Sequence, residues 1–158
     1  MGNLPPICAT VLEPTVEAAV ARMTAVAPWC ARVELRLDAL VTPPDDAALV
    51  ALLRGAARPV LATCRPTREG GRWRGAEGPR LALLARAAGL GADWVDVEWD
   101  AAGSLPRVAA KVLVSRHAPP GVRDVEPLLR SLRAAPGDAQ KLALPVDDAA
   151  DALRLLAR

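Results

Sequence analysis

The stretch that decides the fold is RVELRL, residues 32–37, in which apolar and ionisable side chains alternate. Such alternation is typical of a β-strand, because successive side chains of a strand point to opposite faces. The valine and the two leucines then share one face, and Glu34 and Arg36 lie on the other. Ionisable side chains are expensive to bury without partners, so a covered strand of this kind predicts a polar pocket beside it.

Five further segments have the composition of strands, being short, rich in Val, Leu or Ile, and bounded by Pro, Gly or Asp. They are residues 7–11, 59–64, 93–98, 111–115 and 139–144. Helical patterns are found at residues 14–26, 45–55, 78–88, 122–134 and 147–157, with a shorter candidate at 104–109. Strands that alternate with helices predict βαβ units and a parallel sheet. No linker interrupts the pattern, so we expect residues 1–158 to form a single domain.

Two α/β architectures fit this pattern, a doubly wound open sheet and part of a (β/α) barrel. The first strand is not followed by the GxGxxG signature of a dinucleotide-binding sheet, and no P-loop is present. Consecutive strands instead place polar groups on one face near their C-terminal ends: Glu34 and Arg36, Thr63 and Arg65, Asp96 and Glu98, Ser115 and His117, and Lys141. Active sites of barrels lie at this end of the strands. We therefore expect a TIM-barrel type fold, incomplete and limited to about six βα units.

Composition and charge exclude several classes of protein. The 158 residues are 52% hydrophobic and 24% charged, as in a globular protein with a core, and no apolar run reaches the ~18 residues of a membrane span. The net charge of +2 is spread without blocks of like charge, so we expect no nucleic-acid partner. The N-terminus has no features of a signal peptide, which predicts a cytoplasmic protein.

The cysteines and the histidine do not form a metal-binding pattern. Cys8, Cys30 and Cys64 are far apart, and the chain has one His. We therefore expect no metal site, and we expect the three thiols to be small buried groups.

Lys141 and His117 are the candidates for covalent and acid–base chemistry. Of twenty basic residues only Lys111 and Lys141 are lysines, and a lysine amine can lose its proton to become a nucleophile, whereas a guanidinium effectively cannot. Lys141 is a candidate Schiff-base residue; alternatively, it is a strand-end lysine that reaches solvent. His117 is a candidate general acid and base near the same pocket.

Several further charged groups are candidates for the same pocket. Glu34, Arg36 and Arg65 have the chemistry to hold a polar, carboxylated substrate. The Gly-rich loop that follows Arg65 is either a mobile flap over the pocket or a solvated turn. We interpret Asp96 and Glu98 as groups that neutralise the arginines.

Five motifs in order resemble type I 3-dehydroquinate dehydratase. They are ELRLD at 34–38, TCRP at 63–66 with EGG at 69–71, DVE at 96–98, SRH at 115–117 and QKLAL at 140–144. The resemblance implies a lyase of the shikimate pathway, in aromatic amino acid biosynthesis, that converts 3-dehydroquinate to 3-dehydroshikimate without metal or organic cofactor. It implies that Lys141 forms the imine, that His117 moves protons, and that Glu69 orients His117.

The resemblance also assigns substrate-binding positions and leaves alternatives open. Glu34, Arg36 and Arg65 match binding positions of the family, and Thr10 stands where the family usually has a hydroxyl residue on its first strand. A barrel of six units predicts a homodimer or completion by another chain. The alternatives are a non-catalytic remnant, a half-barrel interaction or regulatory module that needs a partner chain, and a different Schiff-base lyase or aldolase.

Overall fold

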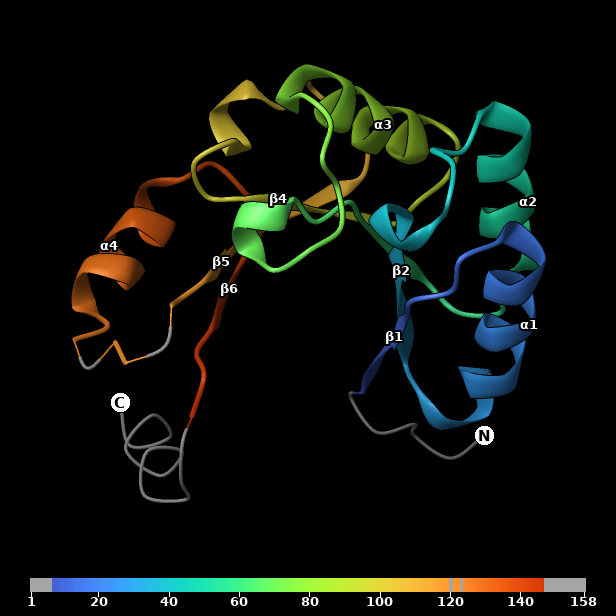
Figure 1. Ribbon diagram of the computed structural model, residues 1–158, viewed down its shortest axis with the longest axis horizontal. Helices are drawn as coiled ribbons and strands as arrows, with labels where there is room; N and C mark the ends of the chain where they lie inside the picture. The colour runs from blue at the N-terminus through green and yellow to red at the C-terminus, as the bar shows by residue number, and fades with distance from the viewer. Residues whose placement is uncertain (1–6, 120, 123, 147–158) are drawn as a thin grey trace.

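The computed structural model describes residues 7–119, 121–122 and 124–146, and its framework is a six-stranded parallel sheet (Figure 1). The strands follow each other in space as they do in sequence: β1 Cys8–Val11, β2 Arg32–Arg36, β3 Val60–Thr63, β4 Trp94–Glu98, β5 Lys111–His117 and β6 Ala139–Ala143. A doubly wound sheet would reverse its strand order at a switch point. The sheet instead curls steadily into half of a barrel, which confirms the barrel-type prediction.

Four α-helices cover the outer, convex side of the sheet: α1 Val16–Val26, α2 Asp46–Gly55, α3 Glu77–Gly89 and α4 Glu126–Ala134. The first two begin where side chains can accept from free N–H groups of the first turn. Thr15 accepts from the Ala18 amide at 3.2 Å, and Asp45 accepts from the Ala48 amide at 2.8 Å. Pro127 occupies the first turn of α4, where its missing N–H removes no helical hydrogen bond.

The hydrophobic core lies between these helices and the outward-facing side chains of the strands. Val33 and Leu35 of β2, which the alternation placed opposite Glu34, are each 1% exposed. Met23 of α1 and Leu49 of α2 are fully buried in the same core. Because the outer face takes the apolar side chains, the polar ones are left to the concave side, called the inner face below.

Three expectations from the sequence need correction or lie beyond the described residues. No helix forms at 104–109; a short 3-10 helix, Ala102–Ser104, comes earlier, and the chain is irregular around Pro106, whose ring cannot donate a helical hydrogen bond. The helix expected at 147–157 lies outside the described residues. Cys30 and Cys64 are buried as expected, but Cys8 is exposed, because β1 has a neighbouring strand on one side only.

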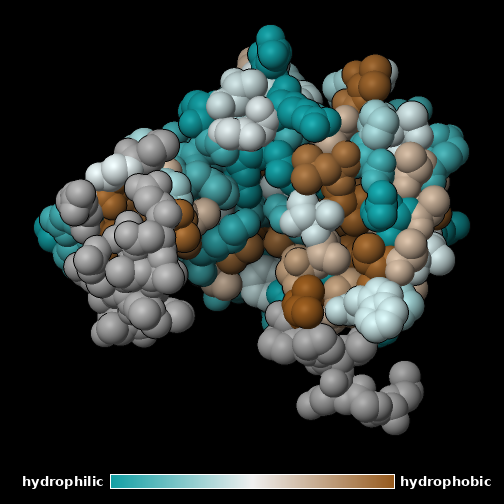
Figure 2. Space-filling model, turned by 60° about the horizontal axis from the view of Figure 1, so that its bottom comes forward, coloured by the Kyte–Doolittle hydropathy of each residue, from teal (hydrophilic) through white to brown (hydrophobic). Residues whose placement is uncertain are grey.

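On the face that Figure 2 shows, the two halves of the molecule differ in surface character. Figure 2 shows hydrophobic side chains gathered over the N-terminal part of the chain, and hydrophilic ones over the middle. Ile7 and Leu12, which flank β1, are 50% and 41% exposed, and Val146, which follows β6, is 47% exposed. None of the helices in the described ranges is both long and apolar enough to cross a membrane.

Candidate active site

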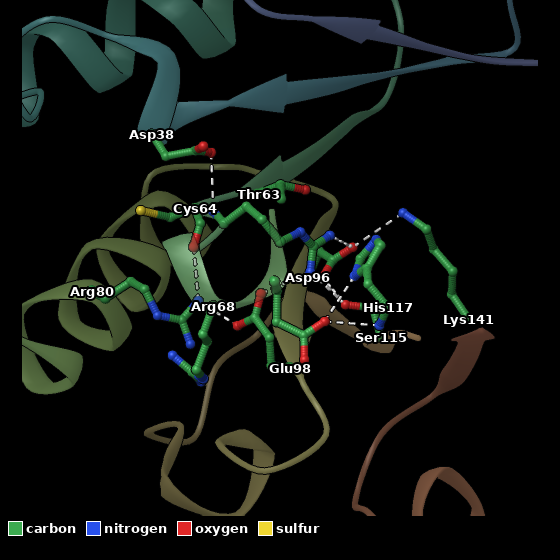
Figure 3. Close-up of polar contacts among 12 residues, drawn as sticks. Asp38, Thr63, Cys64, Arg68, Arg80, Asp96, Glu98, Ser115, His117 and Lys141 are labelled. Atoms are coloured by element: carbon green, nitrogen blue, oxygen red, sulfur yellow. Dashed lines mark hydrogen bonds and ion pairs between the residues drawn. The ribbon is translucent and has the colours of Figure 1, made fainter. Parts of the chain in front are cut away.

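Parallel pairing places polar residues of the inner face side by side on neighbouring strands. Register partners include Thr10 with Glu34, Thr63 with Asp96, Glu98 with Ser115, and Ser115 with Lys141. Since side chains alternate along each strand, partners in register point to the same face. Figure 3 shows that Asp96, Ser115 and Lys141 of this set converge near the C-terminal ends of the strands, where the sequence predicted a polar pocket.

Glu34 connects the first three strands. Its Oε2 accepts from the hydroxyl of Thr10 at 2.8 Å, and its Oε1 accepts from the hydroxyl of Thr63 at 3.0 Å. Each carboxylate oxygen is therefore held by a neighbouring strand, yet keeps lone pairs for another donor. Thr10 and Glu34 are both predicted site residues, and the structure brings them into contact. Thr63 was placed on this face by alternation but was not chosen as a site residue.

Arg65 is buried at the centre of the cluster and is 2% exposed. Its Nη1 donates to Glu98 Oε1 and to Ser115 Oγ, both at 2.7 Å, and its Nη2 donates to Asp96 Oδ2 at 2.8 Å. Burial by itself would lower the pKa of Arg65, but the carboxylates of Asp96 and Glu98 raise it above its ordinary value. The structure thus confirms that Asp96 and Glu98 neutralise an arginine.

Arg80 is a buried cation that the sequence analysis missed. It lies on α3 with no exposed surface, donates to the carbonyl of Cys64 at 2.8 Å, and pairs with Glu98 Oε2 at 2.5 Å. The pKa of Glu98 is raised above its ordinary value, because the effect of burial exceeds the opposite effect of the charges of Arg80 and Arg65. A signal was present in the sequence, since Arg80 shares a helix face with Leu84 and Ala87, at spacings of four and seven residues.

Arg36 is held at the edge of the cluster by Asp38. Its Nε and Nη2 donate to the two carboxylate oxygens of Asp38 at 2.9 and 2.8 Å, as a two-point pair. The same oxygens accept the backbone N–H groups of Arg65 and Arg72, each at 2.9 Å. Asp38 therefore fixes the end of β2 to the loop that follows β3.

The Gly-rich loop that follows Arg65 is held together by hydrogen bonds of its own backbone. The amide of Trp73 donates to the Arg65 carbonyl at 3.1 Å, and the amide of Gly71 donates to the Pro66 carbonyl at 3.0 Å. A Cβ at Gly71 would lie 2.0 Å from the Arg65 carbonyl oxygen, so only glycine fits this close approach. The loop thereby gives Glu69 a fixed position.

Glu69 holds His117 through two contacts to one oxygen. Glu69 Oε2 accepts from the backbone amide of His117 at 2.8 Å and lies 3.1 Å from its Nδ1. Burial would raise the pKa of Glu69, but the hydrogen bonds and the charge of His117 outweigh it and hold that pKa below its ordinary value. A proton on Nδ1 leaves Nε2 with the free lone pair that a base needs.

Lys141 comes from β6 and approaches Asp96 from the side opposite Arg80 (Figure 3). Its Nζ lies 3.7 Å from Asp96 Oδ2, and its side chain is 36% exposed. Lys141 pairs in register with Ser115, and His117 pairs with Ala143, so the lysine and the histidine lie on neighbouring strands of one face. Within the described ranges, no group of three or more His, Cys, Asp or Glu side chains is placed to hold a metal ion.

The family model for type I 3-dehydroquinase matches residues 7–157. The chain belongs to the type I 3-dehydroquinase family. Among its relatives, a 3-dehydroquinate dehydratase of Dehalococcoides mccartyi is 34% identical over 135 residues, which cover 78% of this chain and 57% of that protein. The bifunctional 3-dehydroquinate dehydratase/shikimate dehydrogenase of Arabidopsis thaliana is also 34% identical over 135 residues, covering 78% of this chain and 22% of that protein.

Solved structures agree with this membership in a family of lyases of the shikimate pathway. The crystal structure of 3-dehydroquinate dehydratase from Geobacillus kaustophilus superposes with a TM-score of 0.84 at 26% identity, covering 99% of this chain and 68% of that one. The chain thus spans somewhat more than half the length of the bacterial relative in Dehalococcoides and about two thirds of that in Geobacillus.

Proposed function

We propose that this chain dehydrates 3-dehydroquinate to 3-dehydroshikimate through an imine on Lys141. The observation that supports this most directly is that a lysine and a histidine lie on one face of neighbouring strands, with the histidine held by Glu69. The Lys141 amine adds to the substrate ketone, and loss of water gives an iminium ion. The iminium withdraws electrons and acidifies the adjacent C–H bond.

His117 serves as the acid–base group of this proposal. Its imidazole takes the proton from the carbon next to the iminium and then gives a proton to the departing hydroxyl, so that the elements of water leave the substrate. Hydrolysis of the product imine returns the Lys141 amine. Glu69 keeps the ring in one orientation and one tautomer, as a carboxylate does for a catalytic histidine.

Thr10, Glu34, Arg36 and Arg65 form the proposed substrate-binding set. Glu34 offers acceptor lone pairs to substrate hydroxyl groups, and its orientation is set by Thr10. Arg36 is the arginine of the set with accessible surface, whereas Arg65 is 2% exposed. Arg65 thus shapes the charge of the pocket through Asp96 and Glu98, and Arg36 is placed to meet the substrate.

Borohydride trapping tests the imine directly. The protein is mixed with 3-dehydroquinate or 3-dehydroshikimate, reduced, and analysed by intact mass and by peptide mapping. We expect one adduct on Lys141, and none in Lys141→Ala; Lys111→Ala is the matched control, because it removes the other lysine of the chain and keeps Lys141. A folded sample without adduct would contradict catalysis by this chain and would favour the alternative of a non-catalytic half-barrel module.

We further propose that the half-barrel works with a second copy of itself or with another chain. Among the described residues, β1 and β6 each pair with one strand only, and the exposed Ile7, Leu12 and Val146 lie next to these two edges. Unpaired strand edges flanked by apolar side chains favour association. Light scattering on the purified chain tests this, and a monodisperse monomer with full activity would contradict it. The cytoplasmic location stays a prediction that cell fractionation can check.

A further inference from the structure

Asp96 is a buried carboxylate that three groups share, and no role in the reaction has been given to it above. It has no exposed surface. Its Oδ1 accepts from the Ser115 hydroxyl at 2.5 Å, while its Oδ2 accepts from Arg65 Nη2 at 2.8 Å and lies 3.7 Å from Lys141 Nζ. Arg65 divides its charge between Asp96 and Glu98, and a second cation, Lys141, approaches the same oxygen of Asp96.

The other charged or titratable groups on this side of the sheet have their own partners or lie on more distant strands. They come from β1, β2, the end of β3, β4 and β5: Cys8, Arg32, Glu34, Arg36, Arg65, Glu98, Lys111 and His117. Arg36 pairs with Asp38, and Arg32 and Lys111 lie over the ring of Trp94. Glu98 forms ion pairs with Arg65 and Arg80, and Glu34 accepts hydrogen bonds from two threonine hydroxyls. Among the described residues, Asp96 is thus the carboxylate that forms an ion pair with Lys141.

We propose that Asp96 is the positioning residue of Lys141: it holds the lysine amine at the inner face through its charge. A carboxylate at this distance stabilises the ammonium form, and Arg65, on the far side of the carboxylate, favours the free amine. The Asp96 carboxylate therefore lies between two cations, Arg65 and Lys141, and the Ser115 hydroxyl keeps it in place.

The same carboxylate also has a part in the imine chemistry, and this step rests on the proposed function. The iminium carries its positive charge on the nitrogen that was the lysine amine, so Asp96 is already oriented toward it. A charge that is fixed in advance stabilises the intermediate without reorganisation. Arg65 and Ser115 act here as the supports that hold the Asp96 side chain.

Competitive acetylation tests the role of Asp96 without substrate. The two lysines fall in separate peptides after cleavage at arginine, residues 108–116 and 134–154, so the labelling of Lys141 can be measured against that of Lys111. In Asp96→Asn, at a mildly alkaline pH, we expect Lys141 to be acetylated at least about fivefold faster relative to Lys111. This follows from removing a unit charge 3.7 Å from the amine, even at the dielectric constant of water.

Two further variants separate the charge from the packing. Ser115→Ala removes a hydrogen bond to Asp96 but no charge, so the labelling ratio should stay within about twofold of the wild type. If Asp96→Asn does not fold, Asp96→Ser removes the same charge, leaves Arg65 its ion pair with Glu98, and keeps a hydroxyl group at this position. If the acetylation of Lys141 relative to Lys111 is unchanged in the Asp96 variant that folds, the proposal is overturned. It is also overturned if this ratio rises in Ser115→Ala as much as in the Asp96 variant.

Trapping with 3-dehydroquinate separates this inference from the proposed function. If the wild type forms no adduct, the proposed function fails, while the labelling result still decides the role of Asp96. If the wild type forms the adduct, we expect Asp96→Asn to accumulate it at saturating substrate at least about fivefold more slowly than the wild type, once each rate is divided by the acetylation rate of Lys141 in the same protein. A folded variant in which this ratio equals that of the wild type would contradict the part of Asp96 in the imine chemistry.

Discussion

Replacing Asp38 by asparagine should destabilise the protein strongly, because this one carboxylate accepts four hydrogen bonds. Two come from the Arg36 guanidinium and two from the backbone N–H groups of Arg65 and Arg72, at distances between 2.8 and 2.9 Å. An asparagine side chain keeps one oxygen and presents an NH₂ group in place of the other. Two of the four donors then lose their acceptor.

The expected loss follows from the number of donors that are left without a partner. Leaving one buried donor unsatisfied costs about 1–3 kcal/mol, so two predict a decrease of about 3 kcal/mol in the free energy of unfolding. That is a large share of the roughly 5–15 kcal/mol that stabilises a typical domain. Asp46→Asn is the control, since the Asp46 side chain is 70% exposed and its ion pair with Arg86 should contribute less than about 1 kcal/mol.

Urea unfolding followed by tryptophan fluorescence measures both variants, and pH gives an independent check. Burial would raise the pKa of Asp38, but the hydrogen bonds from Arg36, Arg65 and Arg72 hold it below its ordinary value of 3.8. Its stabilising contribution is therefore complete above pH 3.8 and lost as the pH falls through the lower pKa of the folded state. The difference between wild type and Asp38→Asn should shrink in that acidic range. A difference below about 1 kcal/mol at neutral pH would refute the reasoning.

Three further outcomes follow from the site and its surroundings. Glu69→Gln should slow dehydration by about 10- to 100-fold, which steady-state kinetics check. The variant should also be less stable than the wild type, and this difference should vanish as the pH drops below 4.5, because the pKa of Glu69 is lowered in the folded state. Thermal melts at several pH values check the difference in stability. Gly71→Ala should displace the loop, since its Cβ would meet a carbonyl oxygen at 2.0 Å, and a wild-type rate together with a wild-type melting temperature would argue against that. A thiol reagent should modify Cys8 in the native protein but leave Cys30 and Cys64 unmodified, because these two thiols are buried. Burial also raises the pKa of Cys64 to about 12. Mass spectrometry identifies the labelled peptides.

Alternation along the strands predicted most of the inner face. Glu34, His117 and Lys141 lie on the face where a period of two places them, because parallel register keeps that period in phase across the sheet. The boundaries of all six strands differ from the prediction by two residues or fewer. The failed helix at 104–109 contains a proline, so the local apolar pattern there was outweighed by the missing N–H group.

Partner choice inside the pocket could not be predicted in the same way. The sequence shows that Arg36 and Arg65 lie on the polar face. It does not show that Arg36 pairs with Asp38, whereas Arg65 donates to Asp96, Glu98 and Ser115. Such pairings depend on side-chain reach across strands up to 50 positions apart in the chain. Burial of Cys8 was wrongly predicted because exposure at β1 depends on which strands lie next to it, not on the cysteine itself.

The strand order of the sheet also determines how the protein can fold. Strands that pair in the sheet are also consecutive in the chain, so Thr10 reaches its partner Glu34 only 24 positions away. No pairing within the described sheet has to wait for a distant segment, and short loop closures are associated with fast folding. The sheet can therefore grow one βα unit at a time during synthesis, with each new strand adding to the edge left by the last, much as repeats add to a solenoid.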